Sequence, residues 1–467
     1  MPETLQEMVA RARVAQREIE DWPQEKVDEM VAAVGWKIYQ RAAAEACARL
    51  AVDETGIGIY EDKLLKHQKK ILGTLRDLQG VRTVGLVEDD RARGIKKIAK
   101  PVGVIAAITP MTNATSTIGA NGLPMLKTRN AVIFAPHPRA KHSCALACDY
   151  MREGLWQVGA PVDLIQNITE PSIEASQEIM KLADLVVATG GGALVKSAYS
   201  SGTPAYGVGA GNAVVIVDET VDVAQAAKKI MLGKVFDNAT SCSSENSVVI
   251  QAAIYEGMLE HFKELGGYLC SRDEKEILRQ VMWPDGVHIS KEVVGQDASK
   301  IAGLAHLPDA DQIKFIMVIG EAVGAEDMFS GEKLSPVLTV WKYQEFGEAV
   351  DLVTRITRFS GYGHSCGIHS QDEGHIMELA LKAKVSRMMV NQVQCYANSG
   401  NYNNGMPFAL TLGCGTWGGN ITSENVHWKH FMNVTWVSYP IPDVVPNEKE
   451  IFGGVWEKFG KINTPDE

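Results

Sequence analysis

One cysteine stands in a setting that suits a nucleophile. Cys242 lies among small polar residues in the segment 236–246. Residues 228–235 before it have helical spacing, and residues 247–250 after it read as a strand. A cysteine on a turn between two such elements can be reached by a substrate, and its thiolate is a strong nucleophile. The pattern therefore predicts covalent chemistry at this sulfur.

Two glycine-rich segments are candidates for lying close to a bound ligand or to the reacting centre. Gly190 and Gly191 follow the apolar run 185–188 and precede a helical stretch, so their backbone N–H groups could approach a phosphate. A tight turn without a ligand explains them equally well. Residues 207–212 hold alternate glycines, but they precede a strand, whereas a dinucleotide fingerprint must follow one. We expect this second segment to be a loop that passes close to a reacting centre.

The remaining cysteines are expected to be structural. Cys144 and Cys148, with His142 nearby, could form half of a metal site, but no second ligand pair follows. Two small apolar residues on a buried helix face is the favoured interpretation. Cys366 and Cys414 are also interpreted as structural thiols. Eight cysteines without paired short spacings do not predict a disulfide framework, which favours a reducing cytoplasm.

The elements that must position Cys242 fall into two classes. The first eighty residues are helical in pattern, with Pro23 near the start of one helix and a break at 56–58. From residue 100, helical segments alternate with nearly continuous apolar runs, as expected for strands covered on both faces. The runs are residues 104–108, 131–135, 164–165, 185–188, 214–217, 248–250, 315–319, 337–340 and 388–390. This alternation of apolar runs and helical segments predicts a parallel, doubly wound α/β fold in two lobes, with Cys242 near their junction.

Length and charge limit the remaining possibilities. A chain of 467 residues is too long for one simple core. The net charge of −11 is spread along the chain without a basic block, which argues against nucleic acid as a partner. The chain shows no signal-peptide core and no apolar run long enough to span a membrane, so we expect no membrane association and a cytoplasmic protein. An alternating segment at 431–437 predicts an edge strand that could pair with the other lobe or with another subunit.

Several segments together resemble the CoA-acylating branch of the aldehyde dehydrogenase superfamily. The segment 236–245 is similar to the branch's nucleophile segment, and residues 109–117 and 135–141 resemble the loops after its first two cofactor-domain strands. Residues 332–336, 363–365 and 410–420 are similar to three further branch motifs. The resemblance runs over nearly the whole chain in matching order.

The resemblance implies a fold, ligands and site residues. It implies two Rossmann-like lobes and a small β oligomerisation element, divided as a cofactor-binding domain 1–236, a catalytic domain 237–430 and a C-terminal segment 431–467, in a homodimer or homotetramer. It implies NAD or NADP, with coenzyme A as co-substrate. The implied catalytic residues are Cys242 as nucleophile, Asn113 in the oxyanion hole and His364 as a proton relay, although a hydrogen-bonded loop histidine remains open. The implied cofactor-binding residues are Thr109, Pro110, His137, Arg139, Gly190, Gly191 and Glu332, with Lys141 in the same basic cluster.

One difference from the family pattern distinguishes hydrolysis of the thioester from its thiolysis by coenzyme A. Hydrolytic members of the superfamily carry a glutamate in the segment that matches residues 206–212, where this chain has Val208. Water needs a general base at neutral pH, whereas the thiol of coenzyme A ionises far more readily. The missing carboxylate therefore favours thiolysis. Glu245, three residues after the nucleophile, is expected to cap or to form a salt bridge.

The substrate is expected to be a small polar aldehyde. Ser241 precedes the nucleophile, and Thr240, Ser243 and Ser244 also flank it. Residues 113–117 and 391–394 are polar as well, and an ionised group needs such partners. Within the branch the chain most resembles the members that act on sulfoacetaldehyde, with acetaldehyde and succinate semialdehyde as alternatives. A cysteine acyltransferase without redox chemistry and a catalytically silent scaffold are the alternatives from other classes.

Overall fold

The computed structural model describes residues 3–461. Residues 1–2 and residues 462–467 of the expected C-terminal segment lie outside the described residues. The chain begins with four helices: α1 (Leu5–Ile19), α2 (Gln24–Tyr39), α3 (Arg41–Thr55) and α4 (Tyr60–Leu78). The expected break after α3 is confirmed, because Gly56 ends that helix in the left-handed conformation, with φ of 69°.

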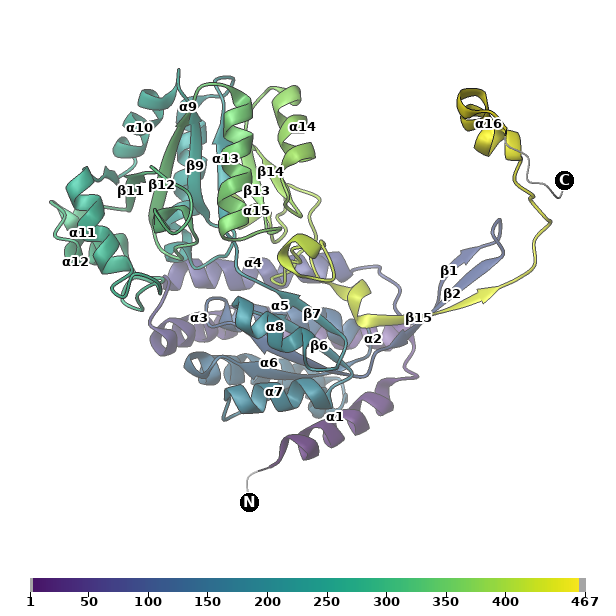
Figure 1. Cartoon of the computed structure of the whole chain (residues 1–467). Coiled ribbons are helices and arrows are strands. Elements are labelled where there is room, and N and C mark those ends of the chain that lie inside the picture. The colour runs from purple at the N-terminus through teal and green to yellow at the C-terminus, as the bar shows by residue number, and fades with distance from the viewer. Residues whose placement is uncertain (1–2, 462–467) are drawn as a thin grey trace.

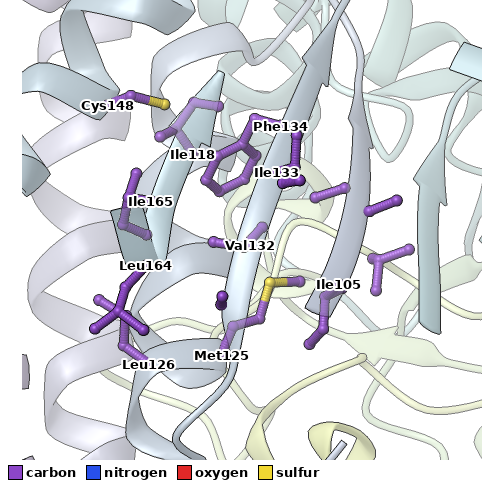
Figure 2. Packing of buried hydrophobic residues seen from close by; sticks show 14 of the residues in the cluster. Ile105, Ile118, Met125, Leu126, Val132, Ile133, Phe134, Cys148, Leu164 and Ile165 are labelled. Carbon is purple, nitrogen blue, oxygen red and sulfur yellow. The ribbon is translucent and has the colours of Figure 1, made fainter. Parts of the chain in front are cut away.

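The first lobe is built on a parallel sheet of five strands in the order β5-β4-β3-β6-β7. Its strands are β3 (Val104–Thr109), β4 (Ala131–Pro136), β5 (Ile165–Asn167), β6 (Leu185–Thr189) and β7 (Ala205–Val208). Helices α5 (Ala114–Lys127), α6 (Lys141–Gln157), α7 (Ile173–Leu182) and α8 (Gly192–Tyr199) connect them. Every residue of β3 and β4 is buried, as the continuous apolar runs predict. Figure 2 shows Ile105, Val132 and Phe134 of these strands packed against Ile118 and Met125 of α5.

The order of this sheet creates a place for a ligand. The chain proceeds outward from β3 through β4 to β5, and then returns to place β6 on the other side of β3. The strand order therefore reverses between β3 and β6. In open parallel sheets, ligands bind in the crevice beyond the carboxyl ends of the strands at such a point. The segments that follow β3 and β6 contain Pro110 and Gly190.

The second lobe holds a seven-stranded parallel sheet in the order β10-β11-β12-β9-β8-β13-β14. Its strands are β8 (Ala213–Val217), β9 (Glu245–Gln251), β10 (Gly267–Leu269), β11 (Phe315–Ile319), β12 (Val337–Tyr343), β13 (Cys366–His369) and β14 (Met388–Val390). Its helices include α9 (Val223–Val235), α10 (Tyr255–Glu264), α11 (Arg272–Met282), α12 (Ala298–Leu304), α13 (Phe346–Phe359), α14 (Glu373–Lys382) and α15 (Gln394–Ala397). The apolar runs in the expected catalytic domain 237–430 predict β9, β11, β12 and β14 of this sheet, but not β8, β10 or β13.

Residues 213–217 lie in the expected cofactor-binding domain 1–236, but in the structure they belong to the sheet of the second lobe. They form β8, which pairs with β9 and β13 of the second lobe. An apolar run identifies a buried strand but does not specify its partners. The domain boundary expected at residue 236 therefore falls after β8 and α9 of the second lobe, and the division into domains remains a prediction.

A third sheet extends from the body of the molecule. Strands β1 (Gly85–Asp90), β2 (Ile95–Pro101) and β15 (Met432–Ser438) form it in the order β1-β2-β15, with antiparallel pairs. The expected strand at 431–437 is confirmed as β15, at one edge of this sheet. Figure 1 shows the sheet, and helix α16 (Glu448–Phe459) beyond it, projecting away from the two lobes. Every helix within residues 3–461 is too short or too polar to span a bilayer.

Helix α4 lies between the two lobes (Figure 1). Its Lys63 and Lys66 contact Asp237, and its Lys70 donates to the carbonyl oxygens of Ser399 and Gly400. The sequence assigns α4 to the cofactor-binding domain. One face of this helix contacts the segment that carries Cys242 and the segment at 399–400.

Candidate active site

The predicted residues from both lobes meet at one cavity of about 160 Å³. Residues of the first lobe reach it from segments just after strands β3, β6 and β7. Residues of the second lobe reach it from segments just before β9, β12 and β13, three strands that lie close together in their sheet. The predicted residues that line the cavity are Pro110, Asn113, Gly190, Gly191, Cys242, Glu332 and His364. The carboxyl edge of one sheet thus faces the amino edge of the other across the cavity.

Cys242 and His364 form a close pair. The Cys242 Sγ lies 3.2 Å from Nε2 of His364, and Nδ1 of the same ring lies 2.8 Å from Oγ of Ser365. Burial raises the pKa of the Cys242 thiol to about 12, and the nearby Glu332 carboxylate adds to this shift. Burial lowers the pKa of His364 to about 3, with a contribution from the Arg387 guanidinium. At neutral pH the pair is therefore a thiol and a neutral imidazole, and Nε2 can accept the proton of the thiol.

Arg387 supports this pair and is absent from the sequence prediction. It is 5% exposed and donates from Nη1 to the carbonyl oxygen of His364 at 3.0 Å, and from Nη2 to the carbonyl oxygen of Gly413. Its positive charge lowers the pKa of the Cys242 thiol, against the larger effect of burial. Arg387 therefore fixes the backbone that carries His364 and favours a thiolate nearby. No spacing pattern distinguishes such an arginine from a surface one.

Asn113 is oriented by a second unpredicted residue. It precedes α5, and its Oδ1 accepts a hydrogen bond from Nζ of Lys66 at 2.8 Å. An ammonium group can only donate, so it fixes the carbonyl end of the amide and leaves the Nδ2 end on the other side. Asn113 also lines the cavity that contains Cys242. The amide N–H group expected in an oxyanion hole is therefore available there.

The loop predicted at 207–212 is shorter in the structure, because Gly207 and Val208 are the last residues of β7, and only residues 209–212 connect β7 to β8. This shorter loop passes close to Cys242, as its glycines predict. A Cβ atom placed on Gly211 would lie 1.8 Å from the carbonyl oxygen of Cys242, so only glycine fits. The Gly211 N–H donates to Oε1 of Glu332 at 3.2 Å. Burial raises the pKa of Glu332 to about 8. Val208 lines the cavity, so an apolar side chain stands where hydrolytic relatives are expected to carry a carboxylate.

The turn before the nucleophile has an unusual backbone. Asp237, Asn238 and Ala239 have φ angles of 50°, 51° and 57°, a conformation that non-glycine residues rarely adopt. The Asp237 Oδ2 lies 3.1 Å from Nζ of Lys63 and 2.5 Å from Nζ of Lys66. Burial alone would raise the pKa of the Asp237 carboxyl group, but these two ammonium groups hold it below its usual value. The strained turn is thus fastened to α4 by a buried ionic cluster.

Replacing Asp237 by asparagine is expected to lower the free energy of unfolding by about 3–5 kcal/mol, because it leaves buried ammonium groups without a counter-charge. Because the folded-state pKa is lowered, the stabilisation is present above the unfolded-state value of about 3.9 and is lost as the pH falls through the folded-state value. Urea unfolding at pH 7 measures the difference. Glu170→Gln, which removes the exposed partner of Lys141, is the control and should cost less than about 1 kcal/mol. Equal losses in the two variants would contradict the ionic role of Asp237.

A second groove, of about 530 Å³, adjoins the first cavity, and both are lined by Pro110 and Thr189. Thr109 and His137 also line this groove, as the cofactor prediction expects. The other basic residues of the cluster point elsewhere: Arg139 donates to the carbonyl oxygen of Thr55, and Lys141 pairs with Glu170 at 3.1 Å. Of the predicted basic cluster, only His137 lines the groove.

The remaining thiols and Glu245 have structural environments. All eight cysteines are free, and every one except the half-buried Cys242 is buried. Glu245 accepts a hydrogen bond from the backbone N–H of Gln394, the first residue of α15, at 2.8 Å. It therefore acts as a cap for that short helix, one of the two roles expected for it.

A third cavity, of about 100 Å³, is lined by Asn113 and by Ser241, the residue before the nucleophile. The other polar residues expected around a substrate are mostly buried and do not line this cavity, including Thr115, Ser116 and Ser243. In their place, α4 contributes Lys66, Lys69 and Lys70 to the lining. The polar character that the sequence predicts for this region is therefore present, but it is cationic.

Comparison with known proteins agrees with this geometry. The sequence model of the aldehyde dehydrogenase family matches residues 1–269. A sulfoacetaldehyde dehydrogenase from Acholeplasma sp. is 49% identical over 95% of this chain and 93% of that protein. An acetylating aldehyde dehydrogenase from Geobacillus thermoglucosidasius has a TM-score of 0.91 and 35% identity, covering 95% of this chain and 98% of that one. A propionaldehyde dehydrogenase from Rhodopseudomonas palustris, solved with bound CoA and an acylated cysteine, has a TM-score of 0.84 and 28% identity, covering 94% of this chain and 97% of that one.

Proposed function

Because the chain belongs to the aldehyde dehydrogenase family, in its CoA-acylating branch, we propose that it interconverts sulfoacetaldehyde and the corresponding acyl-CoA with NAD or NADP. The observation that carries this proposal is the pair of Cys242 Sγ and His364 Nε2, 3.2 Å apart, in a cavity where Val208 replaces a carboxylate. This arrangement supports formation of a thioester on the enzyme and its transfer to a second thiol.

The groove fits a nucleotide cofactor. It lies beyond the carboxyl ends of β3 and β6, where the strand order reverses, and it is continuous in its lining with the cavity around Cys242. Gly190 and Gly191 precede α8, so free N–H groups at the start of that helix suit a phosphate. We assign Thr109, Pro110 and His137 to cofactor binding in the groove, and Glu332 to the nicotinamide side. When bound, NAD(P) supplies the acceptor for the hydride.

Acylation begins when the thiol of Cys242 transfers its proton to Nε2 of His364 and the sulfur attacks the aldehyde carbon. The carbon–sulfur bond forms as the carbonyl π bond opens, so negative charge develops on the oxygen. We assign Asn113 Nδ2 and the backbone N–H of Cys242 as donors to that oxygen, since both residues line the cavity, and one such donor typically contributes about 2.7–4 kcal/mol. Loss of hydride from the same carbon then leaves a thioester on Cys242.

Deacylation needs a nucleophile and an acceptor for its proton. The thiol of coenzyme A attacks the thioester carbon, its proton moves to His364, and Cys242 leaves as a thiolate that is reprotonated from the same imidazole. The imidazolium formed during acylation first loses its proton to solvent, so His364 is again uncharged and can accept the proton of coenzyme A. Water is a much poorer nucleophile, and the cavity wall at Val208 offers it no base.

The test of thiolysis supplies sulfoacetaldehyde and NAD(P) with and without coenzyme A. With coenzyme A we expect sustained formation of NAD(P)H and acyl-CoA, measured by the absorbance of the reduced nicotinamide. Without it we expect at most one equivalent of NAD(P)H per active site, because the thioester is not discharged. Sustained release of free acid without coenzyme A would overturn the proposal. Acyl transfer without any change in NAD(P)H would favour the non-redox acyltransferase.

The projecting sheet supports assembly of identical subunits. Strand β15 is an edge strand, and Trp436 on it and Phe459 at the end of α16 are 57% and 69% exposed. An unpaired edge with large apolar side chains suits association with another copy of the chain, so we propose a homodimer or homotetramer. The eight free thiols support a cytoplasmic location.

A further inference from the structure

The third cavity is walled on one side by three lysines of a single helix. Lys66, Lys69 and Lys70 of α4 line it, together with Asn113, Ser241 and Tyr396. Lys66 and Lys70 are 6% and 4% exposed, so two of the three ammonium groups are held away from bulk water. Burying charged groups in a small cavity is costly unless each has a partner.

The three lysines differ in the partners that they have. Lys66 pairs with Asp237 and donates to Asn113. Lys70 donates to two backbone carbonyl oxygens, which are neutral acceptors. Lys69 forms no ion pair with any residue in 3–461, and its Nζ lies over the rings of Tyr396 and Tyr402, at 4.9 and 5.8 Å from their centroids. Lys69 is thus the ammonium group whose charge is least compensated.

The charge around the cavity is positive overall. Lys63 joins the three lysines in the cluster, and the carboxylates Asp62 and Asp237 act on Lys63 and Lys66. Burial raises the pKa of the nearby Glu245 to about 8, which removes its charge at neutral pH. Burial also lowers the pKa of Lys69, and it lowers that of Lys70 to about 7. An anion in the cavity would relieve the uncompensated charge of both groups.

We propose that this cavity is the subsite for the anionic group of the aldehyde and that Lys69 binds it directly. The inference rests on the proposed function, since it places the substrate's carbonyl carbon at Cys242. Asn113 lines both this cavity and the one around Cys242, and Ser241 lies next to the nucleophile. The two cavities therefore share a wall at Asn113, and the proposal directs the substituent on the reacting carbon past this wall toward the lysines. At about 100 Å³ the cavity is well below the roughly 300 Å³ of sites for larger ligands, which favours a short sulfonate over a longer carboxylate.

The experiment compares Lys69→Met with the unaltered enzyme on three aldehydes. For sulfoacetaldehyde, loss of a charge-assisted contact is expected to raise KM and lower kcat/KM by about 10- to 100-fold. For acetaldehyde, which has no anionic group, kcat/KM is expected to change by less than about threefold, which also shows that the variant is folded. Succinate semialdehyde distinguishes the two anions: we expect the unaltered enzyme to prefer sulfoacetaldehyde, and a preference for succinate semialdehyde would overturn the sulfonate assignment.

Arg76→Met is the matched control. The Arg76 Cζ lies 5.9 Å from the centroid of the same Tyr402 ring, but Arg76 does not line this cavity. This variant should leave the ratio of the two kcat/KM values unchanged, and Lys69→Arg should restore part of the preference. Ethanesulfonate, which has the anionic group but no aldehyde, should inhibit the unaltered enzyme competitively and Lys69→Met about 10-fold more weakly.

The outcomes separate this inference from the proposed function. If the unaltered enzyme forms no acyl-CoA from any of the three aldehydes, the proposed function itself fails. If it forms acyl-CoA but Lys69→Met lowers kcat/KM equally for sulfoacetaldehyde and acetaldehyde, only the anion subsite is overturned. Loss of sulfoacetaldehyde turnover alone supports the subsite.

Discussion

Replacing Cys242 by alanine is expected to lower the rate of acyl-CoA formation by at least about 10⁴-fold, because no other group can form the thioester. The remaining donors near the cavity can still bind the aldehyde, but hydride loss from an unattacked aldehyde has no favourable route. Of the eight thiols, Cys242 is the only one that lines the cavity with His364 and the glycine loop. The effect should therefore fall on kcat, with little change in the binding of NAD(P).

Mass spectrometry of the enzyme quenched during turnover locates the intermediate. We expect the acyl adduct on the peptide that contains Cys242. Cys366→Ala is the matched control, because Cys366 is buried in β13 only two residues from His364 and pairs with neighbouring strands through its backbone. This variant should keep both the activity and the adduct. An adduct on another cysteine, or turnover in Cys242→Ala, would contradict the covalent route.

Much of this site could be predicted because its residues adjoin strands. Apolar runs such as 104–108 and 248–250 are covered on both faces, and that pattern identifies buried parallel strands without knowledge of their partners. Parallel strands all carry their loops to the same edge, so Pro110 and Gly190, which follow neighbouring strands, must lie close together. The resemblance implied catalytic roles for Cys242 and His364, and the structure shows that both lie at the facing edge of the second sheet.

Contacts between distant parts of the chain could not be predicted in the same way. Strand β8 resembles the preceding apolar runs in the sequence, and only its pairing with β9 and β13 assigns it to the second sheet. Arg387 acts through backbone carbonyl oxygens, which no side-chain pattern reveals. The lysines of α4 had a weak signal, because Lys63, Lys66 and Lys70 recur at the spacing of one helix face. Asp237 is the anionic partner of Lys63 and Lys66 on this face, and in our inference the anionic group of the substrate is the partner of the neighbouring Lys69.

Replacing His364 by alanine is expected to lower kcat/KM by about 10²- to 10⁴-fold, the usual contribution of a positioned acid–base group. In the unaltered enzyme, burial lowers the pKa of His364 to about 3, so the imidazole is neutral and able to accept a proton at any pH above about 4. We therefore expect kcat/KM to show no fall between pH 8 and pH 5, although an ordinary histidine would produce one near pH 6.5. A fall centred near pH 6.5 would contradict the buried, neutral state of His364.

The pH dependence of His364→Ala tests the pairing of Cys242 with His364 through the ionisation of the Cys242 thiol. Without an acceptor at 3.2 Å, attack by Cys242 depends on the fraction of thiolate, and burial raises the pKa of this thiol to about 12. The rate constant of the initial NAD(P)H burst in His364→Ala should therefore rise about tenfold per pH unit between pH 7 and pH 10. The reason is that thiolate is the minor species throughout that range. Ser365→Ala, which removes only the partner of Nδ1, should keep the flat profile of the unaltered enzyme with a smaller loss of rate. A flat profile in His364→Ala would show that the histidine does not take the proton of the nucleophile.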